Sequence, residues 1–175
     1  MRLRKLEEKD YEKFKDFSKE YLNSGDDRYQ KKAISQETFS NYLEELSKFE
    51  NLETTPAHLV PSIFFCFVDD SDNFIGAIRL RKSLNDNLKI EGGHIGYDIR
   101  PSKRNQGFGT IMLSLCLDKA SELNLEKVLI TCFTDNPASA KVIEKNGGLL
   151  ESIEPSPRNG KDTRRYWVKL TAPKS

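Results

Sequence analysis

A glycine-bearing loop, RNQGFGT at residues 104–110, lies between a predicted strand and a predicted helix. The strand HIGYDIR covers residues 94–100 and stops before Pro101. The helix covers 109–124 and carries its apolar residues on one face. The run KVLITCF at 127–133 is mostly apolar, which is typical of a strand that is buried on both faces of a sheet. A strand, a helix and a second strand in this order predict an α/β unit at the centre of the fold.

The segments on either side of this unit predict a mixed sheet. Hydrophobic patterning and turn residues indicate strands at 1–6, 62–68, 74–81, 149–155 and 164–170, and helices at 11–22, 35–49 and 135–148. The polar segment 82–93 is expected to be a loop. The predicted fold class is α/β (α+β), with a mixed, mostly antiparallel sheet of six to seven strands and helices on both faces. The 175 residues are expected to form a single domain, 1–175.

The charge balance bounds the partners of the chain. Lys and Arg total 28 against 27 Asp and Glu, which argues against bulk attraction to nucleic acid or to an anionic membrane. The N-terminal residues lack the apolar core of a signal peptide, and no apolar run approaches the roughly 20 residues of a membrane span. We therefore expect a cytoplasmic protein that binds neither nucleic acid nor membrane.

The cysteines and histidines give no sign of a metal site. Cys66, Cys116 and Cys132 are widely spaced, and each lies in an apolar segment. We expect them to be reduced, buried and inert. The chain has no CxxC pair and only two histidines, so no metal is expected.

The glycine loop has the features of an anion site. A helix N-terminus offers unpaired N–H groups and a favourable dipole, and glycine lets a backbone approach a phosphate closely. The loop does not match a P-loop, and Met112 stands where the dinucleotide fingerprint needs its third glycine. A tight turn that binds nothing explains the loop equally well when it is taken alone.

The wider context resembles one known superfamily. RNQGFG fits the pattern R/Q-x-x-G-x-G/A, and DNPASAKVIEKNGG follows it about 30 residues later as a helix that begins at an asparagine. Together with the flanking elements, these motifs resemble the GCN5-related N-acetyltransferase (GNAT) superfamily, and a bacterial subgroup of predicted acetyltransferases in particular. The resemblance implies a GNAT-like fold and an N-acetyltransferase that moves the acetyl group of acetyl-CoA directly to a primary amine of a small molecule or peptide.

The resemblance also implies which residues hold acetyl-CoA. The pyrophosphate would lie against the backbone of the glycine loop, at Arg104, Asn105, Gln106, Gly107, Phe108, Gly109 and Thr110. The pantetheine arm would lie along the preceding strand, at Tyr97, Asp98 and Ile99. Asn136 and Ser139 would contact the same arm from the start of the next helix, although Asn136 is also a natural helix cap.

The catalytic groups are less defined. Many relatives carry a tyrosine as general acid where this chain has Ile143, and Tyr97 and Tyr166 are possible substitutes. The candidate bases are His94, whose ordinary pKa suits the task, and Glu91. A structural histidine and a solvated carboxylate are the competing interpretations of these two residues.

Three other functions remain open at this point. The chain could be a non-catalytic acetyl-CoA-binding regulatory module, a transferase for another acyl-CoA, or an interaction domain without a cofactor, which leaves RNQGFG unexplained. A homodimer through the terminal strands is a family-level expectation.

The acceptor is also open. The loops 21–35, 82–93 and 154–163 would form its wall. Acidic residues there (Asp26, Asp27 and Glu91) would attract a cationic amine, whereas Arg158, Arg164 and Arg165 would hold a carboxylate or phosphate.

Overall fold

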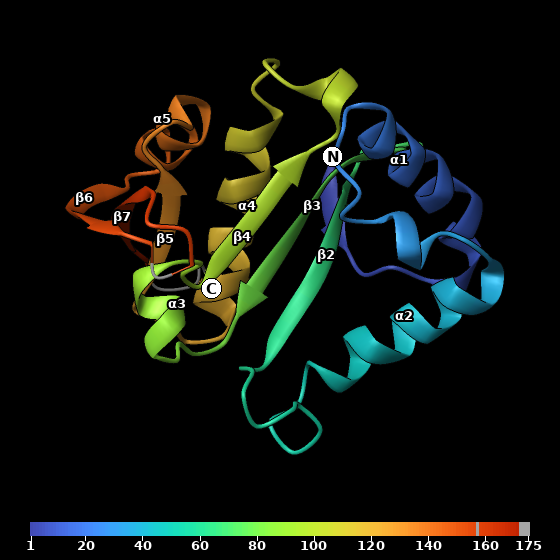
Figure 1. Ribbon diagram of the computed structural model, residues 1–175, viewed down its shortest axis with the longest axis horizontal. Helices are drawn as coiled ribbons and strands as arrows, with labels where there is room; N and C mark the ends of the chain where they lie inside the picture. Colours follow the sequence, from blue (N-terminus) through green and yellow to red (C-terminus); the bar gives the residue numbers. More distant parts are fainter. Residues whose placement is uncertain (157, 172–175) are drawn as a thin grey trace.

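The computed structural model describes residues 1–156 and 158–171 and contains one seven-stranded sheet (Figure 1). The strand order is β1-β2-β3-β4-β5-β7-β6, and every neighbouring pair is antiparallel except β4 and β5. The strands are β1 (Arg2–Arg4), β2 (Ser62–Val68), β3 (Phe74–Arg81), β4 (Ile95–Ile99), β5 (Lys127–Phe133), β6 (Leu149–Pro155) and β7 (Asp162–Lys169). The predicted mixed, mostly antiparallel sheet is confirmed.

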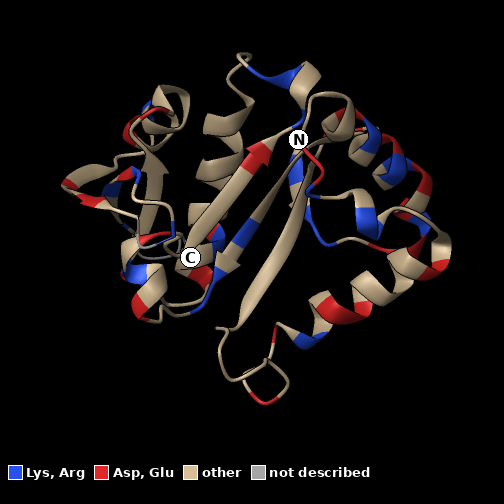
Figure 2. Cartoon of the chain, in the orientation of Figure 1, with Lys and Arg blue, Asp and Glu red and all other residues tan. Residues whose placement is uncertain are grey.

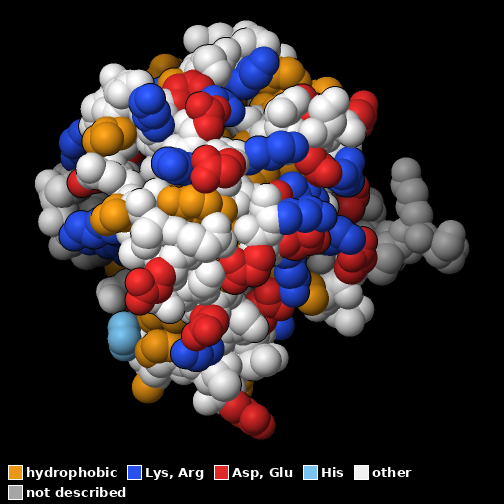
Figure 3. Space-filling model, turned by 90° about the vertical axis from the view of Figure 1, so that its right-hand side faces the viewer, with side chains coloured by type: hydrophobic (Ala, Val, Ile, Leu, Met, Phe, Trp, Pro, Cys, Tyr) orange, Lys and Arg blue, Asp and Glu red, His pale blue; other side chains and the backbone are white. Residues whose placement is uncertain are grey.

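Helices cover both faces of this sheet, as predicted (Figure 1). The helices are α1 (Tyr11–Asn23), α2 (Gln36–Lys48), α3 (Asp86–Ile90), α4 (Phe108–Glu122) and α5 (Pro137–Lys145), with 3-10 turns η1 (Glu8–Asp10), η2 (Gln30–Lys32) and η3 (Pro101–Lys103). Helices α1 and α2 pack on one face of β1–β4, and α4 packs on the other. On the outer side of α1 and α2, positive and negative side chains are interspersed (Figure 3).

Two separate cores lie on the two faces of the sheet. Beneath α1 and α2 the core is largely aromatic, with Phe14 and Phe39 in contact at 5.1 Å between ring centroids. Beneath α4 the core is mainly aliphatic and includes Met112 and Leu113. Strand β2 serves both, because alternate residues of a strand point to opposite faces. This explains why its sequence, SIFFCFV, is an unbroken apolar run.

Residues 82–93, which were expected to form a loop, contain the short helix α3. The prediction was wrong here because five residues are too few to show a helical period. The helix is defined by its cap instead, since the Asn85 side chain accepts a hydrogen bond from the Leu88 N–H at 3.0 Å.

Strands β4 and β5 meet at one end only. Their ladder has one pair, Ile95 with Ile130. Just before it, His94 is bound twice to Leu129: its N–H donates to the Leu129 carbonyl at 2.7 Å, and its Nδ1 accepts from the Leu129 N–H at 2.9 Å. Beyond Ile95 the two strands diverge, and this divergence opens the slot described below (Figure 1).

Gly93 permits this close junction. Its φ is +59°, and an added Cβ would lie 2.3 Å from the carbonyl oxygen of Leu129. Gly25 also has a positive φ, of +85°, but an added Cβ there would meet nothing within 4 Å. A substitution at Gly25 therefore adds backbone strain alone, whereas one at Gly93 adds both backbone strain and a steric clash.

We expect Gly25→Ala to lower the free energy of unfolding by about 1–2 kcal/mol, the cost of the left-handed conformation. Gly93→Ala should lower it by a further ~1–3 kcal/mol, because β4 or β5 must move. Urea unfolding of both variants measures the difference. Equal losses would show that β4 and β5 are not in close contact at Gly93.

Candidate active site

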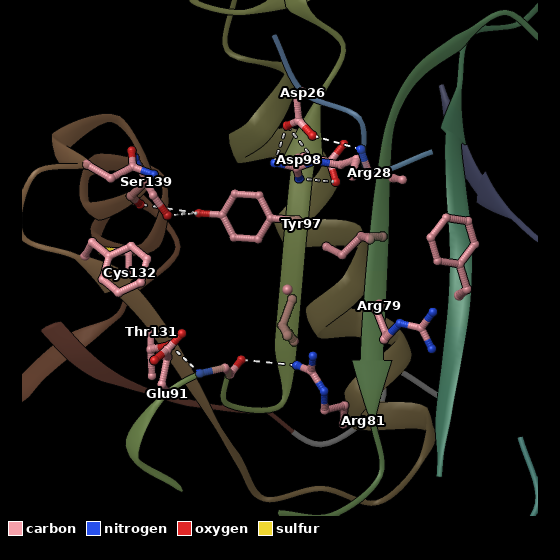
Figure 4. Close-up of a pocket in the computed structure, with 18 of the residues that line it drawn as sticks. Asp26, Arg28, Arg79, Arg81, Glu91, Tyr97, Asp98, Thr131, Cys132 and Ser139 are labelled. Carbon is pink, nitrogen blue, oxygen red and sulfur yellow. Dashed lines mark hydrogen bonds and ion pairs between the residues drawn. The ribbon is translucent and has the colours of Figure 1, made fainter. Parts of the chain in front are cut away.

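A cavity of about 690 Å³ lies where β4 and β5 diverge (Figure 4). Strands β3, β4 and β5 form its floor, and its walls come from the segment before α2, from residues 91–92 and from the start of α5. Of the two candidate bases, Glu91 lines the cavity and His94 does not. Four residues expected along the pantetheine arm also line it, which are Tyr97, Asp98, Asn136 and Ser139.

Tyr97 and Ser139 face each other across the slot. The Tyr97 hydroxyl lies 2.9 Å from the Ser139 Oγ and donates to the Ser139 carbonyl oxygen at 3.3 Å (Figure 4). Burial raises the pKa of Tyr97 to about 12, so the phenol is a hydrogen-bond donor at neutral pH. Asn136 caps α5, because its Oδ1 accepts from the Ser139 N–H at 3.0 Å. Its Nδ2 donates to no other group among the residues that the structure describes, so capping leaves this amide group free for a ligand.

The glycine loop follows the far end of β4. Within the described ranges, the N–H groups of residues 105–109 donate to no other group, and Gly107 caps α4 with a φ of +82°. The Arg104 Nε donates to the Ile99 carbonyl at 3.0 Å and ties the loop to β4. Gly109 has a separate role: an added Cβ would lie 3.1 Å from the Val142 Cγ2, so glycine here lets α4 approach α5. The loop thus presents a row of free donors at a helix N-terminus, which suits an anion.

The Asp98 side chain has three hydrogen-bond donors that could not be identified from the sequence. Its partly buried carboxylate accepts hydrogen bonds from the hydroxyls of Tyr21 and, at 2.8 Å, Tyr29, and from the Arg28 Nη1 at 3.1 Å. Burial raises the pKa of Asp98, while these three donors oppose that shift. The side chain therefore fixes the segment between α1 and α2 on β4, and only the backbone of Asp98 remains for a ligand in the slot.

The structure brings Glu91 to the cavity. Its carboxylate accepts a hydrogen bond from the Ser156 hydroxyl, and Arg158 Nη1 lies 3.8 Å from its Oε1. Thr131 holds the adjacent backbone, since its Oγ1 accepts from the Gly92 N–H at 2.9 Å. Glu91 is therefore fixed in orientation at the end of the slot where β4 begins.

His94 lies instead in the β4–β5 junction. Its side chain is buried, and its Nδ1 lone pair is taken by the Leu129 N–H. Burial and the nearby Arg81 lower the pKa of His94 to about 4, so the imidazole stays neutral. This geometry places His94 in the contact between β4 and β5 and outside the cavity wall, whereas Glu91 lies in that wall.

Of the two tyrosines expected as substitutes for Ile143, only Tyr97 lies in the cavity wall. Tyr166 is buried and its hydroxyl donates to Glu144 at 3.0 Å. Ile143 itself is fully buried in the core beneath α4 and α5.

Two arginines expected in the acceptor wall point elsewhere. Arg164 donates to the Thr134 carbonyl at 2.9 Å, and Arg165 is paired with Glu151 at 3.0 Å. Sequence reasoning missed four other cations in the cavity wall, which are Arg28, Lys32, Arg79 and Arg81. The sequence signal for Arg79 and Arg81 was their position in FIGAIRLR, because charged residues on an otherwise apolar, buried strand are rare unless they have a binding partner.

The three cysteines are free and buried, as predicted. Cys132 lines the cavity, but burial raises the pKa of its thiol, which disfavours the thiolate needed for nucleophilic attack. In the part of the chain that the structure describes, no cluster of three His, Cys, Asp or Glu side chains is arranged to hold a metal ion. The described helices include none with the length and apolar character of a membrane span.

Comparison with known proteins identifies the family. The Acetyltransferase (GNAT) domain family matches residues 1–148. The chain belongs to the GNAT acetyltransferase family. The resemblance stated from the sequence and the enzyme class, an acetyl-CoA-dependent acyltransferase, are thereby confirmed. No curated protein matches the chain in a sequence search.

Solved structures of the same fold cover nearly the whole chain. Mycobacterium smegmatis RimJ, in complex with CoA-disulfide, has a TM-score of 0.71 at 15% identity, and the match covers 95% of this chain and 80% of that one. A mutant of the spermidine N-acetyltransferase SpeG from Vibrio cholerae has a TM-score of 0.63 at 20% identity, with 97% and 95% covered. The ribosomal L7/L12 α-N-protein acetyltransferase RimL, in complex with coenzyme A, has a TM-score of 0.68 at 16% identity, with 96% and 93% covered. At these identities the likeness shows the fold alone.

The neutral His94 predicts a pH-dependent stability. The unfolded chain protonates a histidine near pH 6.5, whereas folded His94 resists protonation down to about pH 4. Its contribution to stability is therefore complete above about pH 6.5 and is lost as the pH falls towards 4. The full effect is at most about 3 kcal/mol. We expect His94→Asn to flatten the fall in unfolding free energy between pH 7 and pH 4.

The exposed His58 supplies the control for this measurement, since His58→Asn should leave the pH dependence unchanged. Urea unfolding at several pH values compares the two variants with the parent. A His94→Asn variant that keeps its stability and its pH dependence but loses turnover would support His94 as the base instead.

Proposed function

We propose that this protein transfers the acetyl group of acetyl-CoA directly to a primary amine of a small molecule or peptide. The observation that carries the proposal is the slot itself: free backbone N–H groups lie at one end, and a cavity with Tyr97 and Glu91 lies at the other. Family membership and the printed activities of the structural neighbours, which include spermidine and a ribosomal protein, support an amine as the acceptor.

The residues present fit acetyl-CoA as co-substrate. The free N–H groups of residues 105–109, at the N-terminus of α4, would hold the pyrophosphate without a charged side chain. The pantetheine arm would lie in the slot between β4 and α5, within reach of the free Asn136 amide and of Ser139. The edge of β4 beyond Ile95 has no partner strand on this side, so its backbone groups are available to the arm.

Glu91 and Tyr97 would assist the two bond changes. The amine nitrogen attacks the thioester carbonyl, a C–N bond forms and the C–S bond breaks. The proton lost by the nitrogen passes to Glu91, directly or through water. The pKa of Tyr97, about 12, lies above the roughly 8.5 of a free thiol, so full proton transfer from Tyr97 to the departing sulfur is uphill. Tyr97 would instead donate a hydrogen bond to the sulfur, which leaves as a thiolate.

Binding of the co-substrate can be tested with a matched pair at Gly107. An added Cβ at Gly107 meets nothing within 4 Å, and both Asp and Asn tolerate its left-handed conformation. We expect Gly107→Asp to weaken acetyl-CoA binding about tenfold or more, because a carboxylate would repel the phosphates. Gly107→Asn should have a much smaller effect.

Calorimetric titration with acetyl-CoA measures this difference, and circular dichroism checks the folding of both variants. Equal affinities for the two variants would show that the loop is only a turn. Tight binding without thiol release on any amine would favour the alternative of a non-catalytic acetyl-CoA-binding regulatory module. Turnover only with longer acyl chains would favour a transferase for another acyl-CoA.

The catalytic roles predict different losses at Glu91 and Tyr97. Glu91→Gln should lower kcat by ~10²–10⁴, the usual contribution of a general base. Tyr97→Phe should lower kcat about tenfold, the value of one hydrogen bond to the leaving group. Neither variant should change acetyl-CoA affinity more than a few-fold. Release of the CoA thiol is the assay, and Glu154→Gln, on β6 and outside the cavity wall, is the control. Full activity in Glu91→Gln would remove Glu91 from the mechanism.

A further inference from the structure

The wall of the cavity contains more positive than negative side chains. It includes the cations Arg28, Lys32, Arg79, Arg81 and Arg158 and the carboxylates Asp26, Glu91 and Asp98. In Figure 2, the positive positions of β3 lie inside the sheet. Figure 4 shows Arg81 directed towards the backbone next to Glu91, whereas Arg79 is directed towards β2. The whole chain is nearly neutral, so this excess is local.

All three carboxylates already have cationic partners. Arg28 is paired with Asp26 at 2.6 Å and with Asp98 at 3.1 Å. Arg158 lies 3.8 Å from Glu91. Among the residues that the structure describes, Lys32, Arg79 and Arg81 form no ion pair. Three positive charges therefore line the cavity without a carboxylate of the described residues in direct contact, although the charge of Glu45 acts on Lys32.

Neutral groups hold these three cations in place. The Arg81 Nη1 donates to the carbonyls of Gly92, at 3.2 Å, and Gly93, at 3.0 Å. This side chain lies beside Gly96, since an added Cβ there would be in ordinary van der Waals contact, 3.7 Å from the Arg81 Nη1. The Nε and Nη2 of Arg81 donate to no other group in the described ranges, so these donors are available to a ligand.

Arg79 and Lys32 are held in the same manner. The Arg79 Nη1 donates to the Ser62 Oγ at 2.9 Å, and its guanidinium lies 5.6 Å from the centre of the Phe64 ring. The Lys32 Nζ lies 4.6 Å from the centre of the Tyr42 ring. These contacts position the charges without neutralising them.

Burial of these positive charges is costly. Burial, Arg79 and Arg158 lower the pKa of Arg81 to about 10, and burial lowers the pKa of Lys32 against the opposing charge of Glu45. Both shifts mean that nearby groups do not fully compensate the burial of the charged forms. A bound anion would supply that compensation, and a guanidinium fork matches a carboxylate or phosphate.

The phosphates of acetyl-CoA are not the anions in question. The glycine loop follows Ile99, the last residue of β4, whereas Arg81 contacts Gly92 and Gly93, which precede the first residue, Ile95. A strand of five residues spans about 16 Å, so the two anion sites lie at opposite ends of the slot.

We infer that the acceptor amine also carries an anionic group, a carboxylate or a phosphate, which Arg79, Arg81 and Lys32 bind while the amine faces Glu91. This inference rests on the proposed function and names the class of its acceptor. It separates this protein from an acetyltransferase of a polycationic amine, because a second positive charge would be repelled by the same three side chains.

Paired acceptors test this inference directly. L-lysine is compared with cadaverine, L-phenylalanine with phenethylamine, and phosphoethanolamine with ethanolamine, beside spermidine, with release of the CoA thiol as the readout. The first member of each pair adds an anion to the same amine. We expect its kcat/KM to be about tenfold higher or more, mainly through KM, because charge-assisted hydrogen bonds are of this strength. The amino acids and phosphoethanolamine distinguish a carboxylate from a phosphate.

Variants connect the preference to the cations. Arg79→Gln and Arg81→Gln should each raise the KM of the member that carries the carboxylate or phosphate about tenfold, and leave that of its partner without this group within a few-fold. Arg2→Gln, which removes a positive charge from the edge strand β1, is the control. Arg79 bonds only to the Ser62 side chain, so its variant stays informative if Arg81→Gln does not fold.

Two sets of outcomes overturn the inference. Preference for spermidine, or for the partners that lack the carboxylate or phosphate, would overturn the inference and leave the proposed function standing. A preference for the carboxylate- or phosphate-bearing member that survives both substitutions would do the same. If acetyl-CoA does not bind, or if no amine causes thiol release, both this inference and the proposed function are wrong.

Discussion

The junction of β4 and β5 is the contact on which the rest of the site depends. One ladder pair and two hydrogen bonds between His94 and Leu129 hold the strands together at one end. Each strand is secured on its outer edge, β4 by five pairs to β3 and β5 by seven pairs to β7. The strands can therefore diverge beyond Ile95 without unravelling the sheet. The divergence leaves backbone donors and acceptors along the slot, and these groups must be satisfied by water or by a ligand. A site for an extended, amide-bearing molecule is thus a consequence of how the sheet is built.

The second constraint joins the N-terminal helices to this slot. Asp98 lies on β4, and its partly buried carboxylate accepts hydrogen bonds from Tyr21, Tyr29 and Arg28. A buried carboxylate without donors would be costly, so the segment between α1 and α2 must dock in a single position to supply them. The aromatic core beneath α1 and α2 stabilises this docking without specifying it, because apolar contacts are not directional. Asp98 therefore both lines the slot and positions the segment between α1 and α2 that forms one of its walls.

The sequence predicted the parts of the molecule that depend on local pattern. The glycine loop, the asparagine cap of α5 and the order of strands and helices all have short-range signals, and together they identified the family. The partners of Asp98 and His94 have none: Arg28 lies 70 residues from Asp98, and Leu129 lies 35 residues from His94. The ordinary pKa of histidine suggested a base, but it carries no signal of the burial in the junction that lowers the pKa of His94. Arg79 and Arg81 were visible as charges on an apolar strand, yet only the pairing of β3 with Gly96 shows that they face the slot.

In the proposed function, the two ends of the slot would attract anions by different physical means. The glycine loop would use uncharged N–H groups to bind a pyrophosphate of fixed geometry, and these groups leave no net charge when it departs. The other end would use side-chain cations, which act over a longer range and tolerate acceptors of different shape. Sequence alone left open whether acids or arginines define the acceptor wall. The structure separates the two by pairing: Arg28 and Arg158 occupy the acids, so the charge that remains to meet an incoming molecule is positive. A nearly neutral chain can therefore present a selective cationic site, because selectivity depends on which charges are left uncompensated and not on their total.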